Sequence, residues 1–251
     1  MLEEKAIKVV HDESQAFIEQ DMSRYSEQDH QVWRILYRRR MEHLEKVACG
    51  AYLHGLRAVG LKQDAVPDLR EVNRRLSAFT GWTATPVAGF LHPQLFFRCL
   101  SQRRFPTTVT VRPLSQLDYL PEPDIFHDVF GHVPMHADTV FAEFLYRYGV
   151  LAAHAESEEQ REALGRLFWY TVEFGLIRES GEIKVYGSGL ISSHADCQNA
   201  LGDNCERLPF SVDGVLARSV DPHHIQPVLF VIESFEELFE AVESPRFQHG
   251  G

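Results

Sequence analysis

The chain has 251 residues, of which 44% are apolar and 24% charged, and its formal net charge is −11. A chain of this length can bury about 70% or more of the surface that its unfolded form exposes, so a sizeable core is available. The acidic balance argues against nucleic acid or an anionic membrane as the main partner, because both bind clustered Lys and Arg.

Apolar periodicity and capping signals predict a mainly α-helical protein with a few short strands. Residues 1–25 are polar and are predicted to form an N-terminal extension, partly disordered, ahead of one domain over residues 26–251. Helices are predicted from a capping box at Ser26 to a break or end near 55–60, and over 67–80, 93–103, 139–153, 158–176, 190–200 and 235–242. Strands are predicted at 107–111, 183–186 and 228–232, and the β-branched run 107–111 is the strongest strand signal. The basic run Arg38 to Arg40 shares a helical pattern with Glu42 and Glu45, which predicts a solvated helix face.

The N-terminus carries acidic residues where a secretory signal peptide has basic ones, and no window approaches the roughly 20 apolar residues of a membrane helix. The cysteines show no CxxC spacing, which favours free thiols in a reducing compartment. They are Cys49, Cys99, Cys197 and Cys205. We therefore expect a cytoplasmic protein.

Two histidines, His127 and His132, stand among apolar residues in the stretch 121–136. Such histidines must be paired, ligated or neutral, because burying an unpaired polar group is unfavourable. Residues at this spacing lie about 140° apart around a straight α-helix, so both imidazoles can face one point only if the helix breaks. Gly131 and Pro134 predict that break near Gly131.

Glu173 is almost alone as a charge in the apolar helical segment 167–176, where a carboxylate is unfavourable unless it is paired or ligated. With the two histidines it would form a two-histidine, one-carboxylate site, which suits non-haem Fe(II) that activates dioxygen. Spacing alone leaves two alternatives open: the histidines only pack in the core, or Glu173 faces solvent or pairs with Arg178. A zinc protease motif fits less well, because HDVFGH lacks the HExxH spacing.

Three motifs together resemble the pterin-dependent aromatic amino acid hydroxylases, most closely the short bacterial phenylalanine 4-monooxygenases. They are PEPDIFHDVFGHVP at 121–134, WYTVEFGL at 169–176 and YGSGLISSHAD at 186–196. The resemblance implies a basket-like, mostly helical catalytic domain over residues 26–251. It also implies hydroxylation of L-phenylalanine to L-tyrosine with O2 as co-substrate and with Fe(II) and tetrahydrobiopterin, or a related tetrahydropterin, as cofactors. The implied iron ligands are His127, His132 and Glu173.

The same resemblance implies where the pterin binds. The flat cofactor would stack on the ring of Phe96 near Leu91, since an aromatic face suits a bicyclic ring. Asp128 would reach the pterin through water. For Phe96, ordinary core packing stays the alternative.

Arg112 matches the family's arginine that binds the substrate carboxylate, and its guanidinium suits bidentate pairing. A surface salt bridge with Asp118 or Glu122 is the alternative. Asp124 would act behind the iron ligands or cap the helix that follows.

Four further residues complete the expected substrate pocket. Trp169 and Phe126 would wall the space for the ring, and Gly189 would let the substrate backbone approach closely. Ser192 would orient an iron-bound imidazole from behind.

The segment 219–227, SVDPHHIQP, departs from the family pattern, which leaves tryptophan hydroxylase and meta-hydroxylating phenylalanine hydroxylase as alternatives. In it, His223 and His224 would either lie in a surface loop or bind a second metal. Two alternatives come from other classes: a catalytically silent ligand-binding protein and a zinc hydrolase. Because the chain has no room for the regulatory domain and tetramerisation helix of the animal members, we expect a monomer that binds small molecules.

Overall fold

The structure is a computed structural model that describes residues 9–118, 123–221 and 224–248. Its α-helices are α1 (Glu13–Ala16), α2 (Glu27–Val47), α3 (Gly50–Ala58), α4 (Leu69–Thr80), α5 (Pro93–Leu100), α6 (Thr139–Ala153), α7 (Glu158–Phe168), α8 (Ser188–Ser192), α9 (His194–Leu201), α10 (Val212–Leu216), α11 (Glu236–Val242) and α12 (Pro245–Gln248). The 3-10 helices are η1 (Met22–Arg24), η2 (Leu114–Gln116) and η4 (Val133–Ala137), and the π-helices are η3 (Phe126–His132) and η5 (Trp169–Glu173). The strands are β1 (Val9–Val10), β2 (Thr83–Pro86), β3 (Phe90–Leu91), β4 (Arg104–Thr107), β5 (Leu176–Glu179), β6 (Glu182–Val185), β7 (Glu206–Pro209) and β8 (Val228–Ile232).

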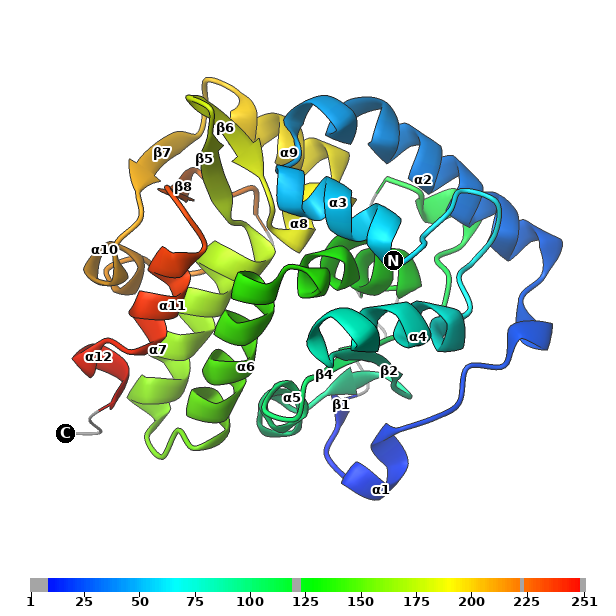
Figure 1. The fold of residues 1–251 in the computed structure, drawn as a ribbon, viewed down its shortest axis with the longest axis horizontal. Helices are drawn as coiled ribbons and strands as arrows, with labels where there is room; N and C mark the ends of the chain where they lie inside the picture. Colours follow the sequence, from blue (N-terminus) through cyan, green and yellow to red (C-terminus); the bar gives the residue numbers. More distant parts are fainter. Residues whose placement is uncertain (1–8, 119–122, 222–223, 249–251) are drawn as a thin grey trace, which may run out of the picture.

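Helices surround a central pair of short helical segments, η3 and η4 (Figure 1). α3 and α4 pack against η4, and α8 packs against η3. α6, α7 and α11 lie side by side, while α2 runs along the opposite edge of the molecule. The centre of the fold is therefore the part of the chain that holds both candidate histidines.

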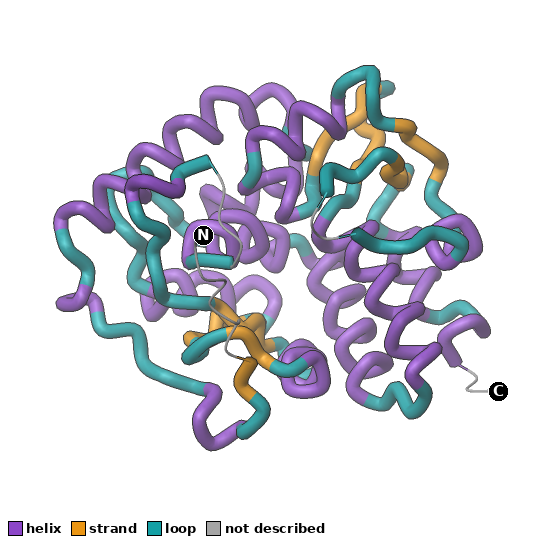
Figure 2. Tube along the Cα trace, turned by 180° about the vertical axis from the view of Figure 1, so that it is seen from behind, coloured by secondary structure: helices purple, strands orange, loops and turns teal. Residues whose placement is uncertain are grey.

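The strands lie at two separate places, as the view from behind in Figure 2 shows. One is a mixed sheet in the order β6-β5-β8-β7, and the other consists of the parallel pairs β2-β4 and β1-β3. The observed β6 and β8 confirm the strands predicted near 183–186 and at 228–232. With so few short strands, the fold is mainly helical, as predicted.

The strand predicted at 107–111 is wrong, because β4 ends at Thr107. Beyond it, the N–H of Thr108 donates to the Asp128 carboxylate at 2.7 Å, and the carbonyl of Thr110 accepts from the N–H of Ile125 at 2.9 Å. These backbone groups bond to η3 and the residue before it, not to a neighbouring strand. Tertiary contacts thus override the β propensity of the run.

The long N-terminal helical region begins and ends as predicted, but it contains an additional break. Ser26 and Asp29 form the expected capping box at the start of α2. α2 ends at Val47, and Cys49 then caps α3, which is a break that the sequence did not predict. α3 ends at Ala58, within the region 55–60 where the helix was predicted to break or end. Gly55 lets α3 lie on η4, because a Cβ there would come within 1.9 Å of the Pro134 carbonyl oxygen.

The expectation of a solvated basic run is wrong for Arg40. Arg38 and Arg39 are exposed, whereas Arg40 is only 3% exposed. α2 points this one guanidinium inward, where it donates to carbonyl oxygens of α8.

The N-terminal segment packs on the body of the protein from Val9 onward, and residues 1–8 lie outside the described residues. β1 pairs in parallel with β3, and Val10 and Ala16 are buried with Leu91, Leu95 and Cys99 in a small second core cluster. The described residues of this extension are thus part of the packed structure.

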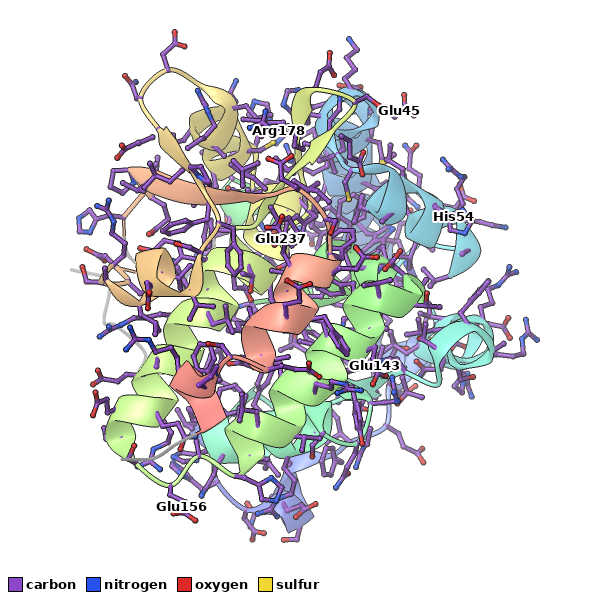
Figure 3. All side chains as sticks on the ribbon, turned by 60° about the vertical axis from the view of Figure 1, so that its left-hand side comes forward. Glu45, His54, Glu143, Glu156, Arg178 and Glu237 are labelled. Carbon is purple, nitrogen blue, oxygen red and sulfur yellow. The ribbon has the colours of Figure 1, made fainter. Side chains whose placement is uncertain are left out.

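Charged side chains cover the outer surface, as Figure 3 shows for Glu45, Glu156 and Arg178. None of the helices in the described part of the chain combines the length and apolar character needed to cross a membrane. All four cysteines are buried free thiols.

Candidate metal centre

The two histidines face one point because they lie on a π-helix. In η3 the backbone N–H groups bond to carbonyls five residues earlier, so residues at that spacing lie on the same side of the helix. The rings of His127 and His132 are 5.1 Å apart and nearly perpendicular. The predicted break near Gly131 is therefore wrong, since a change of helix type does what a break was expected to do.

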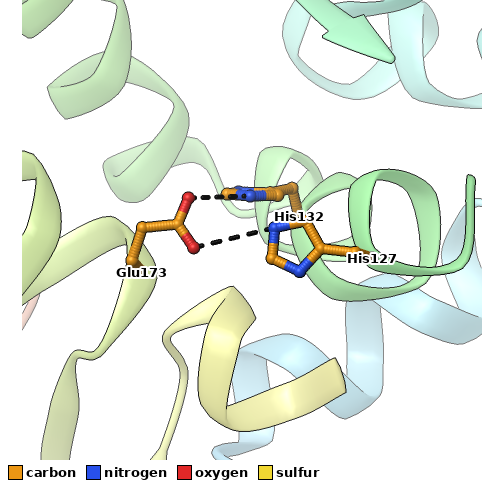
Figure 4. Close-up of side chains that lie close together, drawn as sticks. All are labelled: His127, His132 and Glu173. Atoms are coloured by element: carbon orange, nitrogen blue, oxygen red, sulfur yellow. Dashed lines mark ion pairs between the residues drawn. The ribbon is translucent and has the colours of Figure 1, made fainter. Parts of the chain in front are cut away.

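Glu173 reaches the same point from a second π-helix, η5, which continues α7. Its Oε1 lies 3.1 Å from His132 Nε2, and its Oε2 lies 3.7 Å from His127 Nε2 (Figure 4). The carboxylate is 16% exposed and points toward both imidazoles. Arg178, the alternative partner, instead pairs with Glu233 at 3.1 Å.

These three side chains fit a divalent cation. One ligand atom from each lies within 4.8 Å of the others. Among the described residues, no other group of three or more histidine, cysteine or acidic side chains comes together in this way. Ions held by imidazole and carboxylate sit about 2 Å from each ligand atom, which places the ligand atoms of one ion at most about 4 Å apart. A small inward movement of these side chains would therefore let one ion touch all three. Two nitrogens and one carboxylate match the set used by non-haem Fe(II) sites with open positions.

Hydrogen bonds fix the tautomer of His127. Its Nδ1 lies 2.9 Å from the Ser192 hydroxyl oxygen, and that hydroxyl donates its proton to the Ser188 carbonyl at 2.8 Å. Because a hydroxyl has only one proton, the imidazole must donate at Nδ1. The lone pair is then on Nε2, the atom that faces Glu173, so His127 presents a ligand atom to a metal.

The Glu173 carboxylate is charged. Burial acts to raise its pKa, but the nearby imidazoles and the hydroxyl of Ser188 outweigh burial and hold the pKa at about 2. Ser188 donates to Glu173 Oε2 at 2.7 Å. Sequence reasoning missed Ser188, although it lies in the same YGSGLISSHAD motif as Ser192.

The residues expected to bind a pterin have different surroundings. Phe96 contacts Phe105 edge-to-face at 5.9 Å, and the Phe105 ring lies 4.5 Å from the His132 ring. Asp128 is 7% exposed, and burial raises the pKa of its carboxyl although neighbouring imidazoles oppose the rise. Leu91 is buried in the second core cluster, where it contributes apolar packing.

Arg112 forms a fork-to-fork pair with the buried residue Asp124. Its Nε and Nη2 donate to the two carboxylate oxygens at 2.9 and 2.8 Å, and the two side chains are 9% and 2% exposed. Arg112 thus pairs with Asp124 and not with Asp118, and the other alternative, Glu122, lies outside the described residues. Asp124 also accepts the N–H of His127 at 3.1 Å, a contact that fits both of the roles expected for it. A guanidinium has five N–H groups, so donors are left for a further acceptor.

The remaining residues expected in the substrate pocket are Trp169, Phe126 and Gly189, and their contacts differ. Trp169 lies 4.7 Å from Phe174, and its buried Nε1 has no hydrogen-bond partner among the described residues. Phe126 is 1% exposed and stacks on Phe130 at 4.5 Å, so its ring packs in the core. At Gly189 the close neighbour is protein, since a Cβ would come within 3.0 Å of the Phe174 ring.

The divergent segment 219–227 is partly outside the described residues, which exclude Pro222 and His223. His224 is exposed, and its Nδ1 lies 2.8 Å from Asp221 Oδ2. That contact is typical of a surface loop.

Sequence reasoning also missed His136. It is 1% exposed, lies among the rings of Trp82, Phe105 and Phe141, and has no hydrogen-bond partner for its ring nitrogens among the described residues. Burial lowers the pKa of His136 to about 3, so its ring is neutral.

Comparison with known proteins explains this geometry. Residues 6–245 match the family model described as biopterin-dependent aromatic amino acid hydroxylase. The chain belongs to this family. The resemblance stated from the three motifs is thereby confirmed.

Two relatives and one solved structure show how closely this hydroxylase follows the family. It is 38% identical over 240 residues to phenylalanine-4-hydroxylase of Chromobacterium violaceum, covering 94% of this chain and 80% of that protein. It is 40% identical over 225 residues to phenylalanine-4-hydroxylase of Ralstonia nicotianae, covering 89% and 72%. The C. violaceum structure with iron(III) and the oxidized cofactor 7,8-dihydrobiopterin superposes with a TM-score of 0.90 at 38% identity, over 95% of this chain and 88% of that one. This likeness confirms the predicted hydroxylase catalytic-domain fold.

Proposed function

We propose that this hydroxylase is a phenylalanine 4-monooxygenase that converts L-phenylalanine to L-tyrosine with O2, Fe(II) and a tetrahydropterin. The observation that carries the proposal is the convergence of His127, His132 and Glu173 from two π-helices on one point. The curated relatives of similar sequence named phenylalanine-4-hydroxylase support the choice of substrate.

Iron would be held by His127 Nε2, His132 Nε2 and one oxygen of Glu173. Bound there with tetrahydropterin, it supplies the dioxygen activation that hydroxylation of an aromatic ring requires. The protein keeps the ligands in place before iron arrives, because Ser192 bonds to His127 and Ser188 bonds to Glu173. The related C. violaceum structure holds iron(III) in the same fold, which supports iron as the metal.

The pterin would bind between the iron and α5. Phe96 offers an aromatic face two ring contacts away from His132, and a flat bicyclic ring stacks well on such a face. Asp128 would bond to the pterin through water, with its carboxylate held in place by the N–H of Thr108. Leu91 would support the pterin from the second core cluster.

The amino acid substrate would bind by both ends. Its carboxylate would pair with the N–H groups of Arg112 that Asp124 leaves unused, and Asp124 holds the guanidinium plane in a fixed orientation. Its ring would lie against Trp169 and near Gly189, with Phe126 supporting the pocket from the core. Burial of the ring in an apolar pocket keeps water away from the reacting carbon.

The test is product formation by the purified protein. With Fe(II), tetrahydrobiopterin and air, phenylalanine should give tyrosine, while omission of iron, pterin or O2 should abolish the product. Turnover without O2 or pterin would indicate a hydrolase, and iron binding without turnover would indicate a silent binding protein. His127→Ala should lose iron and activity together, and wild-type tyrosine production by that variant would refute the iron site.

Phenylalanine, tryptophan and tyrosine should be compared side by side. We expect phenylalanine to give the highest kcat/KM and para-tyrosine as the product. A preference for tryptophan, or meta-tyrosine as the main product, would change the assignment within the family without affecting the metal site.

We also propose a cytoplasmic monomer. Four buried free thiols suit a reducing compartment. Sedimentation velocity should give a species of about 28.8 kDa, and a stable dimer or tetramer would contradict the proposal.

A further inference from the structure

Arg40 ties the long helix α2 to the short helix α8. It is 3% exposed, whereas its neighbour Arg38 is exposed. Its Nε donates to the Ile191 carbonyl at 2.7 Å, and its Nη2 donates to the Leu190 carbonyl at 2.9 Å. These carbonyls belong to the last turn of α8, where backbone acceptors lack partners inside the helix.

Within the part of the chain that the structure describes, this guanidinium is surrounded by hydrogen-bond acceptors and forms no ion pair. Its Nη1 lies 3.2 Å from His194 Nδ1, which must accept because arginine has only donors. The Arg40 guanidinium also opposes the rise that burial causes in the pKa of the Cys197 thiol. Among the described residues no carboxylate pairs with it, so the carbonyl ends of α8 are what stabilise this buried cation.

The helix that Arg40 holds supplies both hydrogen bonds behind the metal site. Ser188 begins α8 and donates to Glu173 at 2.7 Å. Ser192 ends α8 and lies 2.9 Å from His127 Nδ1. The two carbonyls that bind Arg40 lie between these serines in the sequence, so a shift of this turn would move both hydroxyls.

The fit of α8 against η3 leaves little room for such a shift. A Cβ on Gly131 would come within 3.1 Å of the Ser188 carbonyl oxygen, which shows how closely the two backbones approach. Arg40 adds a second attachment of α8, to α2.

We propose that Arg40 is a positioning residue for the metal site: it fixes α8 so that Ser188 and Ser192 hold two of the ligands in their metal-binding orientation. This inference rests on the proposed function, because it assumes that His127 and Glu173 bind iron. It extends that function to a residue on α2 that touches neither metal nor substrate.

The experiment compares Arg40→Met with Arg38→Met, which removes the same charge from the exposed neighbour. Competition with a chelator measures Fe(II) affinity, and the visible absorption of the Co(II)-substituted protein reports ligand geometry. Arg40→Met should raise the dissociation constant for Fe(II) about tenfold and change the Co(II) spectrum, as loss of support behind a ligand does in other metal sites. Arg38→Met should match the wild type in both measurements.

Two further variants separate positioning from general stability. Arg40→Lys keeps the charge but cannot reach both carbonyls with a fixed fork, so an intermediate affinity is expected. If Arg40 acts through Ser192, the loss in the double variant Arg40→Lys/Ser192→Ala should be smaller than the sum of the single losses. Arg40→Lys also serves if Arg40→Met fails to fold.

The outcomes distinguish the inference from the function beneath it. Wild-type protein that binds no Fe(II) would overturn the proposed function. Wild-type protein that binds Fe(II), with unchanged affinity and Co(II) spectrum in Arg40→Lys and in folded Arg40→Met, would overturn the role of Arg40 alone. Additive losses with Ser192→Ala would also overturn it, since the two residues would then act independently.

Discussion

The Nδ1 atom of His127 and the hydroxyl oxygen of Ser192 lie 2.9 Å apart, and the imidazole is the donor. The direction follows from the hydroxyl proton, which is already donated to the Ser188 carbonyl. One serine thus decides which nitrogen of a candidate ligand carries the lone pair. In metal sites such contacts fix both the tautomer and the orientation of the ring.

Ser192→Ala should therefore weaken iron binding without unfolding the protein. Loss of this contact frees the ring and its tautomer, and we expect Fe(II) affinity to fall about tenfold or more. Chelator competition measures the affinity, and thermal unfolding of the iron-free protein measures stability. Ser101→Ala, in the exposed turn after α5, is the control. Unchanged iron affinity in Ser192→Ala would contradict the role of the serine.

Arg112→Lys should impair substrate binding more than iron binding. A lysine cannot keep the two-pronged pair with Asp124 and also present donors in a plane to a substrate carboxylate. Loss of one charged hydrogen bond of about 2 kcal/mol corresponds to a rise of about 30-fold in KM for phenylalanine. Steady-state kinetics and iron content of the same preparation provide the check. A normal KM would show that Arg112 only stabilises the fold.

Gly187→Ala should destabilise the protein, whereas Gly165→Ala should stabilise it. A Cβ on Gly187 would come within 2.4 Å of the Gly175 nitrogen and 2.5 Å of the Glu173 oxygen, both backbone atoms that cannot move aside cheaply. Gly165 lies inside α7 with no atom within 4 Å of its added Cβ. We expect a loss of about 3 kcal/mol in the first variant and a gain of about 0.5–1 kcal/mol in the second.

Thermal unfolding of the iron-free proteins tests this pair. At about 2–4 °C per kcal/mol for a chain of this size, Gly187→Ala should lower the melting temperature by roughly 6–12 °C, and Gly165→Ala should raise it slightly. Equal melting temperatures for the two variants would mean that the backbone at Gly187 relaxes freely.

The sequence predicted which residues meet at the metal site but not how the backbone brings them together. In a straight α-helix, two histidines at this spacing cannot both face one point, so the sequence predicts a break near Gly131. A short π-helix leaves no signature in residue periodicity. It differs from an α-helix only in that each N–H bonds to a carbonyl one residue further back, and tertiary packing stabilises this arrangement. The second π-helix, which ends at Glu173, was hidden in the same way.

Buried polar residues mark the other limit of prediction. Arg40 follows two exposed arginines, and only the packing of α8 against α2 turns it inward. Asp124 was expected to cap a helix or support a ligand, and its pairing with Arg112 depends on an approach between two loop segments that no local pattern encodes. Local signals such as the Ser26 capping box were reliable because all partners lie within one helical turn.

His136→Phe should make stability less dependent on pH. The unfolded chain binds a proton at this histidine near pH 6.5, while the folded chain binds it only near pH 3. Stability from this residue is therefore complete above pH 6.5 and falls toward pH 3, by about 1.4 kcal/mol per pH unit. Denaturant unfolding of iron-free protein at pH 7, 6 and 5 should show a shallower decline for His136→Phe than for the wild type. His54→Gln, at an exposed histidine labelled in Figure 3, controls for the number of histidines. Parallel declines in the wild type and His136→Phe would show that the folded protein accepts the proton at His136.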